Sequence, residues 1–136
     1  MTKPIPPLHK YMTSSPHTIG QEQTLVTALN HMMEYNIRHL PVLHGGKVVG
    51  LISDRDIQLV EALEGVDPNK VLVVDAMSMS PYTVDPDTPL DEVCNEMAEH
   101  KYGSAVVVQN GQVVGIFTTV DALNALSELL HTRLMK

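Results

Sequence analysis

The stretch "VVGLISDRDI" (residues 48–57) decides the fold, because nearly the same pattern returns as "VVGIFTTVDA" (residues 113–122). Each copy contains two valines, a glycine, two apolar residues and a hydroxyl residue, followed three positions later by an aspartate. Asp56 corresponds to Asp121, an offset of 65 residues that continues without a gap on the N-terminal side. Further pairs at this offset are Met12 and Met77, Pro16 and Pro81, Leu25 and Leu90, and Gly50 and Gly115. The chain is therefore a tandem repeat.

Each repeat predicts a short strand, a helix, two strands and a second helix. Apolar residues recur at the i, i+3, i+4, i+7 spacing of one helix face. These residues are Leu25, Ala28, Leu29 and Met32 in the first repeat and Leu90, Val93, Cys94 and Met97 in the second. Two short apolar runs then flank "HGGK" or "QNGQ", which predicts an antiparallel hairpin with a glycine-containing turn. We therefore expect an α+β fold of two β-α-β-β-α repeats.

A repeat of about sixty residues buries only a marginal core, so we expect the two repeats to pack on each other around a pseudo-two-fold axis. The predicted boundaries are an N-terminal extension at 1–10, repeat 1 at 11–63, a linker at 64–75 and repeat 2 at 76–136. The second helix of repeat 1 is expected to carry Ile57, Val60 and Leu63. The long C-terminal helix of repeat 2 is expected to carry Leu123, Leu126, Leu130 and Leu134.

Composition limits the classes of partner. Among 136 residues, 43% are hydrophobic and 18% charged, which is typical of a globular domain. The net charge of −7 argues against a broad surface for nucleic acid or anionic membrane. A single cysteine, Cys94, allows neither an internal disulfide nor a multi-cysteine zinc site. The proline-broken N-terminus lacks an apolar signal core, and no apolar run is long enough for a membrane span, so we expect a cytoplasmic protein.

The hydroxyl-x-x-aspartate motif has two interpretations. Ser53-x-x-Asp56 and Thr118-x-x-Asp121 each match a capping box, in which the two side chains satisfy free amides at a helix start. Capping boxes favour Glu or Gln at the acidic position, whereas this chain uses the shorter Asp twice. Alternatively, the amides and hydroxyl at a helix N-terminus bind phosphate, while the carboxylate accepts hydrogen bonds from a ribose diol. The sequence leaves both interpretations open. The second interpretation makes a nucleotide the candidate ligand.

The repeats also resemble a known family. The segments "YMTSSPHTI", "IRHLPVL" and "GGKVVGLISDRDI", with their partners in the second half, resemble a tandem pair of cystathionine-β-synthase (CBS) domains, or Bateman module. The resemblance covers about residues 11 to 130 and is to a stand-alone CBS domain-containing protein. It implies that the two repeats pack sheet to sheet around the pseudo-two-fold axis. It also implies a homodimer, with four repeats in a disc, and an unidentified regulated protein. It also implies regulatory rather than catalytic use of AMP, ADP, ATP or S-adenosylmethionine, in two clefts that are each built from both repeats.

The resemblance implies two sets of cleft residues. Cleft 1 is expected to comprise Arg38, His39, Ser53, Arg55, Asp56, Ser78, Tyr82, Val84 and Tyr102. Cleft 2 is expected to comprise Thr13, His17, Ile19, Ile37, Gly103, Ser104, Thr118, Thr119 and Asp121. In both, the aspartate would hold ribose, the hydroxyl residues would lie near phosphate, and the opposite repeat would supply the base pocket. Two of the three arginines fall in cleft 1, where they suit phosphate, so we expect the charged nucleotide there.

The sequence also bears on three other functions, namely catalysis, metal binding and a role as an interaction adaptor. Catalysis by Ser53, His39 and Asp56 is not expected, because no nucleophile elbow or oxyanion loop surrounds the serine. No metal site is expected, since the seven histidines form no H-x-x-x-H or H-x-H pair. A dimerising interaction adaptor with empty clefts remains the open alternative to a ligand sensor.

Overall fold

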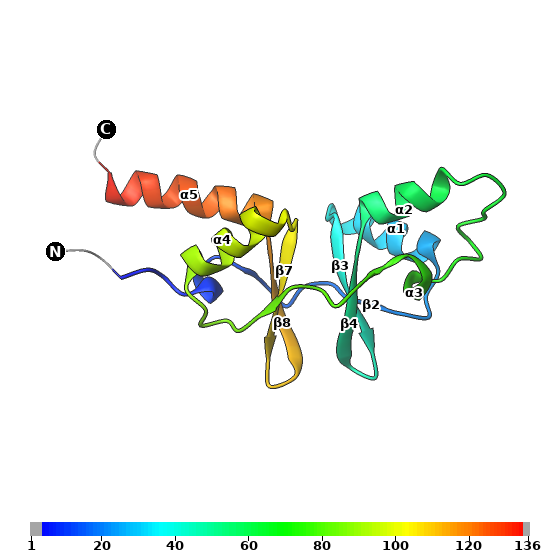
Figure 1. The fold of residues 1–136 in the computed structure, drawn as a ribbon, viewed down its shortest axis with the longest axis horizontal. Coiled ribbons are helices and arrows are strands. Elements are labelled where there is room, and N and C mark those ends of the chain that lie inside the picture. Colours follow the sequence, from blue (N-terminus) through cyan, green and yellow to red (C-terminus); the bar gives the residue numbers. More distant parts are fainter. Residues whose placement is uncertain (1–3, 135–136) are drawn as a thin grey trace. The chain divides into compact units, whose positions relative to one another are not determined.

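The computed structural model describes residues 4–134 and contains two compact units (Figure 1). The first-repeat unit spans Pro16–Pro81, and the second-repeat unit combines residues 4–15 with residues 82–134. The first-repeat unit has one four-stranded sheet, in the order β2 (Ile19–Gly20), β3 (His39–His44), β4 (Lys47–Ser53) and β5 (Ser78–Met79). The sheet of the second-repeat unit has the order β1 (Thr13–Ser14), β8 (Gln112–Thr118), β7 (Ser104–Gln109) and β6 (Thr83–Val84). The predicted α+β class is confirmed, and each repeat follows the predicted β-α-β-β-α order.

The first-repeat unit is built around one hairpin and two longer helices. Its elements are β2 (Ile19–Gly20), α1 (Leu25–Tyr35), β3 (His39–His44), β4 (Lys47–Ser53), α2 (Asp54–Glu61), α3 (Val73–Ala76) and β5 (Ser78–Met79). Helix α1 begins where the side chain of Thr24 accepts a hydrogen bond from the Thr27 amide, and it ends at Asn36 in the left-handed conformation. Both α1 and α2 lie on the same side of the β3–β4 hairpin (Figure 1).

The second-repeat unit repeats this plan with a longer last helix. Its elements are η1 (Leu8–Lys10), β1 (Thr13–Ser14), β6 (Thr83–Val84), α4 (Leu90–His100), β7 (Ser104–Gln109), β8 (Gln112–Thr118) and α5 (Thr119–Arg133). Asp91 and Glu92 in the first turn of α4 complement the positive end of the helix dipole. None of the helices within residues 4–134 is long and apolar enough to cross a membrane.

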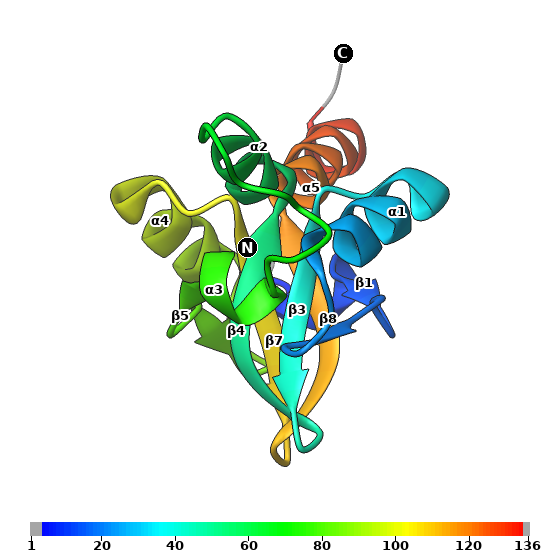
Figure 2. The ribbon, with the colours of Figure 1, turned by 90° about the vertical axis from the view of Figure 1, so that its right-hand side faces the viewer.

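The hairpins form as the turn chemistry predicts. Strands β3 and β4 are antiparallel, as are β7 and β8. The two-residue turns hold Gly45 and Gly46 at φ 59° and 79°, and Asn110 and Gly111 at φ 54° and 76°. Positive φ at both positions is the type I′ geometry that matches the twist of the flanking strands. Figure 2 shows the β3–β4 turn at the end of the hairpin far from α2.

The predicted helix stripes form the two cores. In α1, Leu25, Ala28 and Met32 are buried among residues of β3, β4 and α2. In α4, the buried residues are Leu90, Val93 and Met97, which pack with Phe117 of β8. Leu29 and Cys94 pack at the margins of these cores. The 3.6-residue periodicity therefore identified the correct helix faces in both repeats.

The short edge strands are exchanged relative to the sequence repeats. Strand β1, which precedes the first repeat's helix, pairs with β8 of the second repeat. Strand β5 correspondingly pairs with β4 of the first repeat. A Cβ atom on Gly50 would meet the side chain of Met77 and would lie 2.9 Å from the Ser78 carbonyl oxygen, so glycine permits the close approach of β5 to β4. The segments outside the repeats also pack, since Leu8 and Val73 are each fully buried in a core.

Two expectations about the second helices differ from the structure. Helix α2 ends at Glu61, so Leu63 lies beyond it and is 57% exposed, while Ile57 and Val60 pack inward. In α5 the smaller Ala122 and Ala125, together with Leu129, pack inward. Helix α5 carries Leu123, Leu126 and Leu130 as predicted, and these side chains are exposed, but Leu134 is the C-cap residue and lies beyond the helix.

Candidate functional site

The start of α2 carries the first hydroxyl-x-x-aspartate motif as a complete capping box. The Ser53 amide donates to Oδ2 of Asp56 at 2.9 Å, and the Asp56 amide donates to Oγ of Ser53 at 3.2 Å. Two of the amides left free at a helix start are thereby satisfied. Among the described residues, Oδ1 of Asp56 makes no hydrogen bond and the hydroxyl proton of Ser53 has no acceptor.

The start of α5 carries the second capping box with one additional partner. The Thr118 amide donates to Oδ2 of Asp121 at 2.9 Å, and the Asp121 amide donates to the Thr118 hydroxyl at 3.3 Å. The Thr118 hydroxyl donates in turn to Oδ2 of Asp121 at 3.2 Å. Thr13 of β1 donates to Oδ1 of the same carboxylate at 3.2 Å. Both oxygens of Asp121 are thus engaged, in contrast to those of Asp56.

These contacts correct one step in the sequence argument. The shortness of aspartate argues against capping in the sequence, but both aspartates reach the N-cap amide at 2.9 Å in the structure. Capping and sugar binding are not mutually exclusive, because a carboxylate has two oxygens and about four acceptor sites. Asp56 therefore caps α2 with one oxygen while its other oxygen remains free to accept a hydrogen bond from a ligand.

Arg38 and His39 lie beside the start of α2. The Asp54 amide donates to the Arg38 carbonyl at 3.0 Å, and His39 lies opposite Ser53 in the β3–β4 register. Burial lowers the pKa of His39 below its usual value, against the opposite effect of the nearby Asp54 and Asp56 carboxylates. Arg38 and Arg55 are exposed, and every ion pair between described side chains involves a histidine rather than an arginine. Both guanidinium groups are therefore available to an anion.

Tyr82 and Tyr102 of the expected cleft 1 come together in the second-repeat unit. Their rings stack with centroids 5.4 Å apart, and Tyr102 also stacks on His100 at 5.1 Å. Tyr82 and Val84 line an open pocket of about 590 Å³, whose remaining walls include Asp85, Asp91, Glu92 and Glu96. Burial and the carboxylates of Glu96 and Glu92 raise the pKa of the Tyr82 hydroxyl, which keeps it a neutral donor.

The cleft 2 residues of the second-repeat unit surround the start of α5. The Thr119 amide donates to the Gly103 carbonyl at 3.2 Å, and Ser104 lies opposite Thr118 in the β7–β8 register. The side chain of Ser104 is 3% exposed, and its hydroxyl has no partner among the described residues. A buried hydroxyl without a partner is unusual in a folded protein.

The remaining expected residues have different environments. Ile19 is buried in the first-repeat core, and Ile37 packs against the same core. His17 is exposed and stacks on Tyr35 with ring centroids 3.6 Å apart. Ser78 is exposed on β5 and pairs with Leu51 of β4, so it lies in the same unit as Asp56.

The structure thus assembles each set of site residues in part. In the first-repeat unit it brings together Arg38, His39, Ser53 and Asp56. In the second-repeat unit it brings together Thr13, Gly103, Ser104, Thr118, Thr119 and Asp121. The crosswise pairing of these groups with base pockets from the other repeat remains a sequence-based expectation.

Comparison with known proteins identifies the family. The CBS domain model matches residues 8–61 and 73–128. The chain belongs to the CBS domain family. Hypoxic response protein 1 of Mycobacterium tuberculosis is 32% identical to it over 111 residues, which cover 81% of this chain and 78% of that protein. The CBS domain-containing protein YhcV of Bacillus subtilis is 30% identical over 117 residues, which cover 85% and 83%.

A solved CBS pair has the same fold. The CBS domain pair of protein MJ0100, in complex with 5-methylthioadenosine and S-adenosyl-L-methionine, matches with a TM-score of 0.83 and 28% identity. The match covers 92% of this chain and 98% of that one. The predicted tandem CBS architecture is therefore confirmed.

One cluster on the second CBS repeat was missed by the sequence analysis. Glu96, Glu99 and His100 of α4 place potential metal-ligating atoms within 4.8 Å of one another. A pattern of paired histidines does not detect this cluster, because only one of its three members is a histidine. The detectable signal is the spacing E-x-x-E-H, which places three ligating side chains within one helical turn.

Proposed function

We propose that this protein is a non-catalytic regulatory module that binds an adenosine-containing ligand between its two CBS repeats. The candidate ligands are AMP, ADP, ATP and S-adenosylmethionine, each acting as a regulatory ligand rather than as a catalytic cofactor. Ligand binding would alter how the module contacts a regulated protein, and we place this activity in the cytoplasm. Neither nucleic acid nor a membrane surface is among the proposed partners, because the chain is acidic.

The main support for this proposal is the likeness to a solved CBS domain pair that binds adenosine compounds. The MJ0100 pair, which binds 5-methylthioadenosine and S-adenosyl-L-methionine, aligns with nearly the whole of this chain at 28% identity. Both of those ligands contain an adenosine group. This likeness supports an adenosine group as one part of the ligand that this chain binds. Which group is attached to the ribose depends on the residues of this chain.

The geometry around Asp56 supports cleft 1 as the principal site. The free Oδ1 of Asp56 can accept a hydrogen bond from a ribose hydroxyl while Oδ2 retains the cap of α2. The hydroxyl proton of Ser53 and the exposed guanidinium of Arg38 are available to a phosphate near the same helix start. The neighbouring His39, with its lowered pKa, can donate or accept a hydrogen bond without adding a second positive charge.

Cleft 2 is proposed as a weaker site. Both oxygens of Asp121 are engaged within the protein, and Thr13 must release Oδ1 before a ribose can use it. The positions equivalent to Arg38 and Arg55 are Gly103 and Val120, so this set of residues also lacks an arginine for phosphate. The unpartnered hydroxyl of Ser104 nevertheless offers one hydrogen bond to a polar ligand. We therefore expect an uncharged adenosine derivative to bind here, if a second ligand binds at all.

The contacts of Ser53 support a non-catalytic role. A catalytic serine donates its hydroxyl proton to a histidine base. Here Oγ of Ser53 accepts the Asp56 amide, and the Asp56 carboxylate holds the Ser53 amide rather than an imidazole. No hydrogen bond between Ser53 and His39 is found among the described side chains. Ser53, His39 and Asp56 therefore lack the serine–histidine and histidine–carboxylate hydrogen bonds that an acyl-transfer triad requires.

We further propose that the module forms a homodimer through the exposed face of α5. Leu123, Leu126 and Leu130 are 65%, 52% and 48% exposed on one stripe of the helix, while its alanines pack inward. Such a stripe on a soluble helix favours a partner with a matching apolar face, and a second α5 provides one. The double substitution Leu126→Glu and Leu130→Glu is expected to produce monomers in light scattering. Asn124→Glu, outside the stripe, is expected to leave the dimer intact.

A dimerising adaptor with empty clefts is the second candidate function. The two capping boxes favour it, because they give Asp56 and Asp121 a structural role without any ligand. In that case the apolar α5 stripe would be the functional surface and the carboxylates would only stabilise helix starts.

Thermal unfolding with a ligand panel separates the two functions. A ligand that binds only the native state raises the melting temperature in proportion to the logarithm of its concentration. We expect at least one of AMP, ADP, ATP and S-adenosylmethionine to raise it at millimolar concentration, with GMP as the control nucleotide. Equal melting temperatures with all four adenosine compounds and with buffer would contradict the sensor and favour the adaptor.

A further inference from the structure

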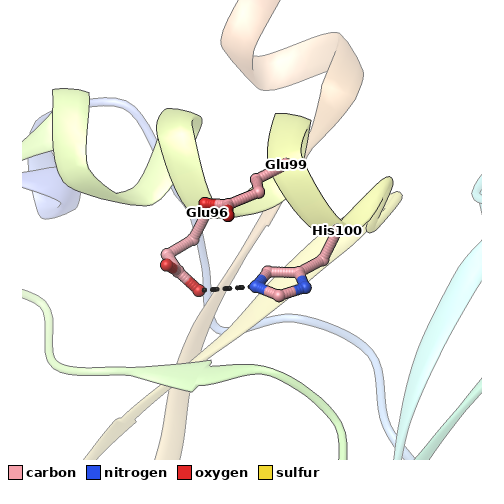
Figure 3. A group of neighbouring side chains, drawn as sticks. All are labelled: Glu96, Glu99 and His100. Atoms are coloured by element: carbon pink, nitrogen blue, oxygen red, sulfur yellow. Dashed lines mark ion pairs between the residues drawn. The ribbon is translucent and has the colours of Figure 1, made fainter.

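Three side chains on α4 form a cluster outside the residues assigned to the two clefts. Glu96, Glu99 and His100 project from successive turns of the C-terminal half of the helix (Figure 3). Their ligating atoms, two carboxylate oxygens and one ring nitrogen, all lie within 4.8 Å of one another. Imidazole nitrogen and carboxylate oxygen are ligands that Zn²⁺ uses in proteins. The cluster therefore has a suitable donor set.

The spacing of the closest pair matches metal coordination. Nε2 of His100 and Oε2 of Glu96 are 3.4 Å apart, as the dashed line in Figure 3 marks. In a tetrahedral zinc site, bonds of about 2.0–2.2 Å place neighbouring ligand atoms about 3.4 Å apart. A metal ion can therefore replace the direct contact between these two atoms without moving the helix. Glu99 is exposed, so its flexible side chain can bring its carboxylate to the same ion.

The imidazole of His100 is held in a defined orientation by an aromatic neighbour. The His100 ring stacks on Tyr102 with ring centroids 5.1 Å apart and an angle of 18° between the planes. Tyr102 stacks in turn on Tyr82, which is half-buried at the wall of the pocket. This stack limits rotation of the imidazole and directs Nε2 toward Glu96. A ligand whose rotation is already restricted loses less conformational entropy on binding.

Charge balance also favours a divalent cation. Two carboxylates carry a charge of −2 and the neutral imidazole adds none, so one divalent ion is neutralised by the cluster. In the absence of a metal, the only opposite charge within the cluster is the one His100 gains on protonation. The nearby Glu92 and Asp91 on α4 make the surroundings more acidic, which strengthens attraction of a cation.

We propose that Glu96, Glu99 and His100 bind a divalent first-row transition metal, with Zn²⁺ as the representative ion and water as the fourth ligand. All three ligands come from one exposed helix, so the site is weaker than a closed structural zinc site. A metal ion bound at this site holds His100 in its stacked position on Tyr102. The inference does not depend on the proposed nucleotide function, because none of the three ligands belongs to either set of cleft residues, and Tyr82 and Tyr102 of the expected cleft 1 only restrict the imidazole.

Calorimetric titration of the full chain with zinc chloride tests the site. Wild-type protein is expected to bind one zinc ion per chain at this cluster. The substitutions His100→Ala, Glu96→Gln and Glu99→Gln are each expected to weaken that binding by at least about tenfold, because each removes a ligand. The changed residues are only partly buried or exposed, and circular dichroism is expected to show that all three variants remain folded.

The chain offers a matched control for the titration. His44 and Glu22 form a similar exposed pair, with Nδ1 and Oε1 3.2 Å apart, and they belong to no cluster of three ligands among the described residues. His44→Ala is therefore expected to leave zinc affinity and stoichiometry unchanged. Wild-type affinity in His100→Ala would overturn the proposal. An equal loss in His44→Ala and His100→Ala would also overturn it, because zinc would then bind any surface histidine.

Discussion

Thr13 donates a hydrogen bond to Oδ1 of Asp121 at 3.2 Å, and this contact distinguishes the start of α5 from the start of α2. Asp56, at the same position of the first repeat, caps α2 in the same way but keeps Oδ1 free within the described residues. The residue equivalent to Thr13 is Ser78, which makes no such contact there. Two nearly identical motifs thus differ in how much of the carboxylate a ligand can use.

Removal of the Thr13 hydroxyl tests this difference. Thr13→Val keeps the side-chain shape and a residue suited to a strand, but it loses the hydrogen bond to Asp121. We expect the free energy of unfolding in urea to fall by about 0.5–1 kcal/mol. Ser78→Ala is the matched control and is expected to leave the unfolding free energy unchanged. A loss in Thr13→Val that persists in an Asp121→Asn background would show that the two side chains are not coupled.

The two pseudo-equivalent glycines are expected to differ in their tolerance of alanine. A Cβ atom at Gly50 would meet both Met77 and the Ser78 carbonyl oxygen, which belongs to the backbone of β5. At Gly115 the three nearest contacts are all with the flexible Met12 side chain. We therefore expect Gly50→Ala to lower the unfolding free energy by about 1–3 kcal/mol, and Gly115→Ala to lower it by less. Equal losses in urea titrations would contradict this explanation of β5 packing.

The lowered pKa of His39 predicts a pH dependence of stability. Burial disfavours the charged ring, so the unfolded chain binds a proton more readily than the folded chain does. The contribution of neutral His39 is fully present above the unfolded pKa of about 6.5 and is lost as the pH falls through the lower folded pKa. His39→Gln is expected to flatten the decrease in unfolding free energy from about pH 7.5 to 5.5. His131→Gln, on the exposed face of α5, is expected to retain the wild-type slope, and a wild-type slope in His39→Gln would contradict the assignment.

Arg38 is expected to discriminate phosphorylated ligands from adenosine. Its exposed guanidinium lies beside the start of α2, where a phosphate would receive both the helix amides and a bidentate cation. Calorimetry with Arg38→Ala should show about 1.5–3 kcal/mol weaker binding of AMP or ATP, with adenosine affinity unchanged. Arg133→Ala removes an arginine of the second-repeat unit, which donates a hydrogen bond to the Pro4 carbonyl and belongs to neither set of cleft residues, and it serves as the control. Equal losses for AMP and adenosine would remove Arg38 from the phosphate site.

Local sequence signals predicted the parts of the fold that depend on neighbours along the chain. The turns around Gly46 and Gly111 formed hairpins because few residues other than glycine and asparagine adopt positive φ readily. The stripes that begin at Leu25 and Leu90 became core faces because their period matches a helix. The capping boxes were recognised as motifs, although the reach of the aspartate was underestimated.

Other features depend on tertiary contacts that periodicity does not encode. Strands β1 and β5 have two residues each, too few to show an alternating pattern or to indicate which hairpin they join. In α5 the inward face consists partly of small residues, Ala122 and Ala125, so the position of the leucines along the sequence did not indicate which face of the helix is buried. The metal-ligand cluster on α4 required the side-chain positions, since E-x-x-E-H also occurs on ordinary solvated helices.

Titration of wild-type and Asp56→Asn protein with an adenosine ligand tests the central claim most directly. The asparagine carbonyl can still accept the Ser53 amide and cap α2, but an NH₂ group replaces the free Oδ1 acceptor. We expect a small decrease in the melting temperature without ligand, because the helix start loses one negative charge, and ligand binding that is weaker by about 1.5–3 kcal/mol. Wild-type ligand affinity in Asp56→Asn would contradict it, because the carboxylate would then serve only to cap the helix.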